Sequence, residues 1–205
     1  MVIIKTTLRE IRQSLGRYIA ILAIVALGVG FFAGLKAAKP AMVDAVEGYL
    51  NTLNFYDFRL LSTLGFEETD IETFQEQKDV ETAAGSYSFD IICENAQGDN
   101  SFVVKTHSIT EGVNTLYLTA GRMPERASEC VVDSLLYSDA QIGEKIILSP
   151  ENDEKDLENF VNKEYTVVGI VQSPLYIQFE RGNTSLGNGK ISGFVYLMPE
   201  AFLML

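Results

Sequence analysis

The stretch YIAILAIVALGVGFFAGL, from Tyr18 to Leu35, holds 18 consecutive residues without a charged side chain. As an α-helix rising about 1.5 Å per residue it is roughly 27 Å long, close to the thickness of a bilayer's hydrocarbon core. Its strongly apolar residues favour insertion by roughly 3–6 kcal/mol in total. The sequence therefore predicts a transmembrane helix over residues 18–36. Within it, Gly30 and Gly34 have G-x-x-x-G spacing, which lets a second membrane helix approach closely.

A cleaved signal peptide is the alternative interpretation of this stretch. Such peptides have an apolar core of about 7–15 residues, followed by a cleavage site lined with small residues. Here the core is longer. Cleavage after Ala38 or Ala37 would place Lys36 or Leu35 at the third position back, where a small residue is needed. A retained membrane anchor is the favoured interpretation.

Charge is divided unevenly along the chain. Residues 1–39 carry six basic residues and one acidic residue, a net charge of +5, whereas the remainder carries 10 basic and 27 acidic residues, a net charge of −17. Four basic residues precede the apolar stretch and two, Lys36 and Lys39, follow it, so the positive-inside rule predicts a cytoplasmic amino terminus and an extracytoplasmic main domain in the cell membrane. So acidic a domain argues against nucleic acid as a partner, because phosphates need Lys and Arg contacts.

Amphipathic segments flank the predicted span on both sides. Residues 1–17 carry a narrow apolar stripe with basic residues off it, which predicts a helix in the membrane interface or docked on a cytoplasmic partner. Residues 37–54 carry a second apolar stripe, which predicts a stalk that is kinked or restarted at Pro40, because proline removes one backbone donor. The two stripes consist of Ile4, Leu8, Ile11 and Leu15, and of Val43, Val46, Leu50 and Leu53.

Residues 55–205 are predicted to form a mixed α/β domain, so the fold class is α+β with one amino-terminal transmembrane helix. Glu67 to Gln77 favours a helix with acidic residues in its first turn, and residues 95–100 favour a hairpin loop. Pro150 to Glu164 is acidic without the glycine of a calcium loop, which predicts a solvated loop or short surface helix. Period-two patterns and short apolar runs predict strands at Asp57–Thr63, Tyr87–Glu94, Phe102–His107, Glu129–Asp133, Lys145–Leu148, Tyr165–Val171 and Phe194–Leu197.

Residue types that carry chemistry are sparse. His107 is the only histidine, and it lies in a strand pattern without a nucleophile elbow or a short-spaced pair of metal ligands nearby. Gly182 to Lys190 lacks the lysine directly after its second glycine that a phosphate loop needs. We therefore predict no catalytic, cofactor-binding or metal site. Cys93 and Cys130 allow two interpretations, one disulfide or two small buried residues.

Four segments together resemble one family. LREIRQSLGRYIAILAIVALGVGFFAGL resembles the first transmembrane segment of FtsX-like ABC transporter permeases of the MacB type. LTAGRMPERASECVVD, IGEKIIL and YTVVGIVQSPLYI, which begin at Leu118, Ile142 and Tyr165, resemble the extracytoplasmic core domain of those permeases, in the same order. The residues that carry the match are Gly121, Arg122, Pro124, Gly143 and Gly169.

The resemblance implies a non-catalytic membrane subunit. Permeases of this family dimerise and couple to a separate cytoplasmic ABC ATPase, whose ATP turnover moves the stalks and outer domains, in export or in mechanotransmission. The family's permeases carry at least three more membrane helices after this domain, so the chain resembles the amino-terminal portion of a larger permease or a truncated product. A membrane-anchored binding or sensor module without an ATPase is the alternative function.

Overall fold

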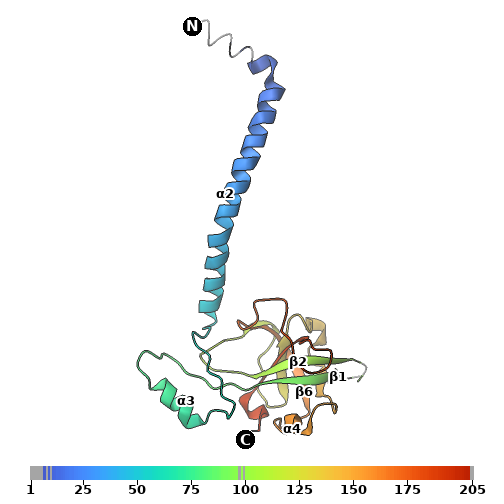
Figure 1. Ribbon diagram of the computed structural model, residues 1–205. Coiled ribbons are helices and arrows are strands. Elements are labelled where there is room, and N and C mark those ends of the chain that lie inside the picture. Colours follow the sequence, from blue (N-terminus) through green and yellow to red (C-terminus); the bar gives the residue numbers. More distant parts are fainter. Residues whose placement is uncertain (1–6, 8, 10, 97, 99, 204–205) are drawn as a thin grey trace. The chain divides into compact units, whose positions relative to one another are not determined.

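A computed structural model describes residues 7, 9, 11–96, 98 and 100–203 (Figure 1). The chain divides into two units, Met1–Tyr49 and Leu50–Leu205. We call the second unit the body. Of the predicted interfacial stripe, Ile4 and Leu8 lie outside the described residues, and Leu15 begins the first long helix.

That helix, α2, runs from Leu15 to Thr52 as 38 continuous residues, about 57 Å at 1.5 Å per residue. It passes through Pro40 without restarting, so the proline removes a backbone hydrogen bond without ending the helix. An 18-residue window of α2 has a mean hydropathy of 2.4, and none of that window is buried within the described structure. α2 is therefore long and apolar enough to cross a membrane, and it is not the core helix of the described structure.

The body is built on a seven-stranded sheet with strand order β3-β6-β4-β7-β2-β1-β5. An additional pairing between β6 and β5 closes the sheet, so six strands form a ring and β3 pairs only with β6. The strands are β1 (Ser88–Asn95), β2 (Ser101–Ser108), β3 (Tyr117–Gly121), β4 (Glu129–Asp133), β5 (Lys145–Leu148), β6 (Glu164–Gln172) and β7 (Gly193–Leu197).

Short helices lie before and between these strands. α3 (Glu68–Gln75) lies in the segment between α2 and β1, and α4 (Glu154–Leu157) lies in the acidic run before β6. The helix predicted at Glu67–Gln77 is confirmed by α3, and of the two alternatives for Pro150–Glu164, a solvated loop or a short surface helix, the structure has a short helix within the run. Two short 3-10 helices, η1 (Asp139–Gln141) and η2 (Pro199–Ala201), follow β4 and β7.

Most predicted strands are confirmed. One predicted strand is wrong, and one strand was not predicted. Asp57–Thr63 forms no strand, because no neighbouring strand pairs with it and its apolar side chains stay exposed. β3 was missed because it is five residues long, none of them buried, and it ends in a glycine. The predicted hairpin is confirmed by the antiparallel pairing of β1 and β2, down to Glu94 opposite Ser101.

Alternate residues of the strands pack into two apolar clusters. In β7, Val195 and Leu197 face one cluster, whereas Phe194 and Tyr196 face the other. Cys93 and Cys130 lie in the first cluster, both free, and burial raises the pKa of each thiol. Of the two interpretations, the structure has the buried thiols. The second cluster, which we call the outer-face cluster, consists of Val131, Val168, Val171, Phe194 and Tyr196.

Candidate functional site

The motif residues of the resemblance gather around the antiparallel pairing of β3 with β6. Gly121 and Gly169 are register partners in that pairing. Gly121 has a φ of +77°, and a Cβ there would lie 2.3 Å from the Val168 carbonyl oxygen. A Cβ on Gly169 would lie 2.4 Å from the Arg122 carbonyl oxygen. Both positions therefore exclude a side chain, because the opposing atoms belong to the backbone.

An ion pair closes the loop that follows. The Arg122 guanidinium donates to both carboxylate oxygens of Glu129, at 2.8 and 2.6 Å, and the Glu125 backbone N–H donates to the same carboxylate at 2.8 Å. These hydrogen bonds, those from Arg122 first, lower the pKa of Glu129 to about 2. We call Gly121, Arg122, Glu129 and Gly169 the motif clasp. Its hydrogen bonds hold the loop between β3 and β4 closed.

The other motif residues lie near the clasp with simpler roles. Pro124 is half-buried in the loop between β3 and β4. Gly143 has a φ of +98° with open space where a side chain would lie, and its backbone N–H donates to the Val167 carbonyl at 2.8 Å. In α2, a Cβ built on Gly30 or Gly34 would meet no described atom within 4 Å, apart from its chain neighbours and the nearby backbone of the helix itself.

A second, more deeply buried ion pair lies at the end of β4. Arg181 donates from Nε and Nη2 to the two carboxylate oxygens of Asp133, at 2.5 and 2.9 Å. The two side chains are 8% and 0% exposed. The guanidinium also lies 5.6 Å from the ring centre of Tyr176 and 5.4 Å from that of Phe194. This arrangement fastens the loop between β6 and β7 to the outer-face cluster.

His107 belongs to the same side of the sheet. Its Nε2 shares a hydrogen bond of 2.7 Å with the Tyr176 hydroxyl, and its ring stacks on Tyr196 with centroids 5.0 Å apart. Burial, followed by the charges of Lys105 and Arg59, lowers the pKa of His107 to about 3. The imidazole is thus neutral, 4% exposed, hydrogen-bonded to one tyrosine and stacked on another.

The residues directly after α2 are hydrogen-bonded to a loop that packs on the outer-face cluster. The carbonyls of Leu53 and Asn54 accept from the backbone N–H groups of Thr115 and Asn114, each at 2.8 Å. The Tyr56 N–H donates to the Asn114 side-chain oxygen at 3.2 Å. We call these five residues the junction. Leu53 is 5% exposed, which makes it the buried residue at the end of the helix.

The junction continues directly into the outer-face cluster. Ile109 and Leu116, at the two ends of the loop that holds Asn114 and Thr115, pack against that cluster. The Ile109 backbone N–H also donates to the Leu197 carbonyl at the end of β7, at 2.8 Å. The segment directly after α2 is therefore held on the body by backbone hydrogen bonds and packed side chains.

The depressions and side-chain clusters of the body were compared with known kinds of ligand site. A depression of about 220 Å³ is lined by residues such as Ser101, Glu151 and Asn188, and it is smaller than the 300–1,000 Å³ usual for small-molecule pockets. The described residues contain no group of three or more His, Cys, Asp or Glu side chains placed to hold a metal ion.

Sequence patterns located the motif residues and missed the others. The motif gave Gly121, Arg122 and Gly169, but Glu129, Asp133, Arg181 and the junction were missed. Asp133 ends a buried apolar strand, ECVVD, and such a charged residue is a usable signal for a buried partner. Arg181 lies 48 residues further along, and nothing local marks it as that partner.

No family model and no curated protein matches this chain. The resemblance to FtsX-like permeases therefore stays a prediction.

Proposed function

We propose that the chain is the amino-terminal portion of an ABC transporter permease of the FtsX/MacB type. In this proposal Tyr18 to Leu35 crosses the cell membrane, the body lies outside the cell, and a separate ATPase supplies the energy. The permease acts as a homo- or heterodimer and is not itself an enzyme. ATP turnover moves α2, and the movement reaches the body for export or mechanotransmission.

The observation that supports the proposal most is the junction. A sensor or binding module needs only an anchor, and a flexible linker after the span is sufficient for that. Here Leu53, Asn54 and Tyr56, which follow α2 directly, are joined by three hydrogen bonds to the loop bearing Asn114 and Thr115, and the ends of that loop pack on the outer-face cluster. A continuous helix followed directly by such a hydrogen-bonded segment suits the transfer of a displacement along its axis.

The fixed loops of the body fit the same role. In the described residues, the ion pairs and hydrogen bonds found at the motif clasp and at Arg181 are occupied in holding loops. A transmitting domain needs such fixed loops, because a rigid body moves as a unit when one end is displaced.

Topology is tested with the chain's own glycosylation sequon. Asn183-Thr184-Ser185 is exposed at Asn183, so translation in the presence of microsomes should glycosylate it if the body crosses the membrane. A Ser185→Ala variant, which keeps Asn183, is the matched control. An unmodified wild-type chain in the membrane fraction contradicts the proposed orientation.

Anchoring is tested in the same preparation by alkaline extraction. Arginines at Ala26 and Leu27 should cost roughly 5–7 kcal/mol at the bilayer centre, comparable to the whole preference for insertion. The wild type should stay in the membrane pellet, and the A26R/L27R variant should be extracted. A glycosylated wild-type chain that is itself extracted indicates a cleaved signal peptide and removes the permease proposal.

Coupling is tested by purifying the full-length gene product in mild detergent. Co-purification of an ABC ATPase at a fixed stoichiometry supports the permease. The expected complex should survive the Asn114→Gly substitution, which keeps the left-handed backbone of Asn114 (φ +52°) but removes its side-chain oxygen. That variant should lower ATP-driven output while ATPase binding stays unchanged. Repeated absence of an ATPase favours the sensor or binding module.

A further inference from the structure

The segment between α2 and α3 leaves a row of apolar side chains in solvent. We call Phe58, Leu60, Leu61 and Leu64 the apolar ridge. Their exposed fractions are 89%, 60%, 78% and 97%. Single exposed apolar residues are ordinary on protein surfaces, but a run within seven consecutive positions is characteristic of an interaction surface.

The ridge is separate from the apolar residues that hold α3 in place. Phe66 packs edge-on against Phe74, with ring centroids 5.7 Å apart. A Cβ on Gly85 would lie 2.5 Å from the Cδ1 atom of Ile71, so the chain passes close against that side chain. The half-buried side chains of α3 therefore already have partners, whereas those of the ridge remain uncovered.

Hydrogen bonds hold this region in a defined shape. Asp70 accepts from the Glu67 N–H at 2.9 Å at the start of α3. Near its end, Gln75 donates to the Glu81 carbonyl at 2.9 Å and accepts from the Ala83 N–H at 2.7 Å. The chain after α3 is thus fastened to the helix, and the ridge stands next to an ordered element.

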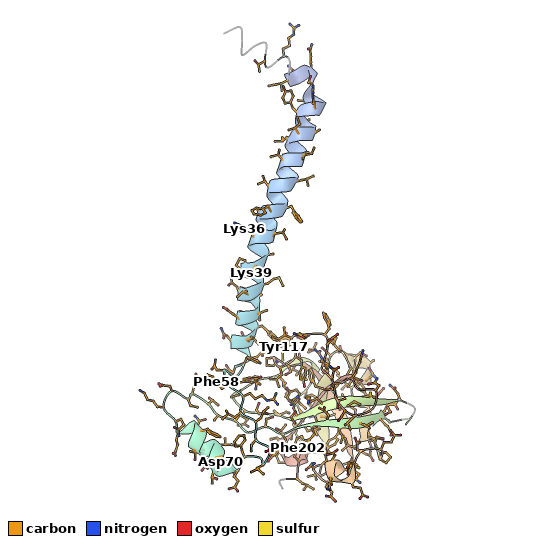
Figure 2. All side chains as sticks on the ribbon, in the orientation of Figure 1. Lys36, Lys39, Phe58, Asp70, Tyr117 and Phe202 are labelled. Atoms are coloured by element: carbon orange, nitrogen blue, oxygen red, sulfur yellow. The ribbon has the colours of Figure 1, made fainter. Side chains whose placement is uncertain are left out.

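Negative charge predominates in the segment that follows the ridge. Residues 58–82 contain seven acidic and two basic residues, a net charge of −5. Figure 2 shows Phe58 on the segment that leads into α3 and Asp70 on α3 itself, beside the strands rather than over them. The exposed carboxylates are those of Glu67, Glu68, Asp70, Glu72, Glu76, Asp79 and Glu81.

We propose that the apolar ridge and the carboxylates of α3 form a docking surface for a basic, amphipathic polypeptide segment of another protein. The ridge takes the apolar side of that segment, and the carboxylates attract its Lys and Arg residues. A second copy that presents the same surface fits poorly, because both surfaces carry a charge of −5. An anionic lipid surface fits poorly for the same reason. This docking surface does not depend on the transport proposal.

The test measures binding of a synthetic amphipathic helix of leucine and lysine to the full chain in phosphatidylcholine nanodiscs, with empty nanodiscs subtracted. Two variants remove the two halves of the surface. F58S/L61S/L64S removes the ridge, and E68Q/E72Q/E76Q removes three carboxylates of α3. The matched control, E151Q/E154Q/E158Q, removes three carboxylates around α4.

The ridge variant is expected to raise the dissociation constant at least about tenfold, which is 1.4 kcal/mol. The α3 variant is expected to raise it about fivefold, and the α4 control less than about twofold. Both test variants alter exposed side chains, and near-UV circular dichroism checks that the body stays folded. If one variant misfolds, the other still tests whether this surface binds the peptide.

Three results overturn the proposal. Unchanged binding by the ridge variant removes the apolar half. Equal losses of affinity in the α3 variant and the α4 control mean that the peptide recognises only the overall negative charge. Sedimentation that shows a dimer of the wild type and a monomer of the ridge variant assigns the ridge to a second copy.

Discussion

Two arginine–carboxylate pairs fasten loops to the same sheet, and they differ in their access to water. In the motif clasp, the side chains of Arg122 and Glu129 are 46% and 10% exposed. At the end of β4, those of Arg181 and Asp133 are 8% and 0% exposed, with aromatic rings beside the guanidinium. The same bidentate chemistry thus occurs once in contact with solvent and once sealed from it.

The difference teaches where each loop's stability comes from. An ion pair in contact with water contributes little, because solvent competes for both partners. A sealed pair contributes little net stability when intact but becomes costly when one partner is lost, because the other charge stays buried. The buried pair should therefore respond strongly to single substitutions, and the clasp should depend more on its close-packed glycines.

The largest expected effect is that of Asp133→Ala. The substitution leaves the Arg181 guanidinium unpaired in a buried position and should lower the free energy of unfolding by about 3–5 kcal/mol. Urea titration of the full chain in mild detergent, followed by tyrosine fluorescence, measures this loss. The double variant D133L/R181M removes both charges and should lose much less, so equal losses in the single and double variants contradict the importance of the unpaired charge.

The second effect tests the glycines of the clasp. In Gly169→Ala, the new methyl group meets the Arg122 and Ala120 carbonyl oxygens, at 2.4 and 3.0 Å. The overpacking should lower the free energy of unfolding by about 1–3 kcal/mol in the same titration. Gly143→Ala is the control, because that position is open and carries only the strain of its positive φ. A larger loss of stability in Gly143→Ala than in Gly169→Ala argues against the close packing of β3 on β6.

The third effect is a pH dependence from His107. Its pKa in the folded chain is lowered to about 3, below the ordinary value of 6.5, so the unfolded chain binds the extra proton first. Stability should be complete above pH 6.5 and fall as the pH decreases toward 3, by up to about 1.4 kcal/mol per pH unit. His107→Gln should flatten the stability profile between pH 6.5 and 4.5. An unchanged slope there indicates that the imidazole is accessible to protons.

The smallest effect belongs to Glu129. Its pKa is lowered from 4.5 to about 2, so its ionised form stabilises the fold above pH 4.5, and this contribution is lost as the pH falls through 2. Glu129→Gln should flatten the profile in that window only, with a smaller loss at neutral pH than Asp133→Ala. If Glu129→Gln proves the more damaging of the two, the comparison of the two ion pairs is reversed.

Much of the fold followed from the sequence where one rule dominates. β4 and β5 were predicted with the bounds that they have, because charged residues bracket the apolar run of β4, and a lysine precedes and Ser149-Pro150 follows that of β5. The long apolar helix was predicted by composition alone. Ring closure was not, since the pairing of β5 with β6 depends on contacts between segments without a shared local pattern.

The candidate site was harder to predict for a related reason. Gly121 and Gly169 were noted as motif residues, but their direct packing is a property of two strands that lie far apart in sequence. Asn114 is hydrogen-bonded to the residues after α2 through its backbone and its side chain. Neither its residue type nor its sequence neighbours predict these contacts. The exposed ridge was mistaken for a strand, because sequence patterns do not reveal whether an apolar run is covered.

Ring closure also limits how other proteins can attach. Among the described strands, only β3 has an unpaired edge, since every other strand has a neighbour on both sides. That edge is five residues long and interrupted by a bulge between Leu118 and Ala120. Open, regular edges invite added strands and fibril growth. A body without such an edge is protected from accidental aggregation when many copies are crowded together.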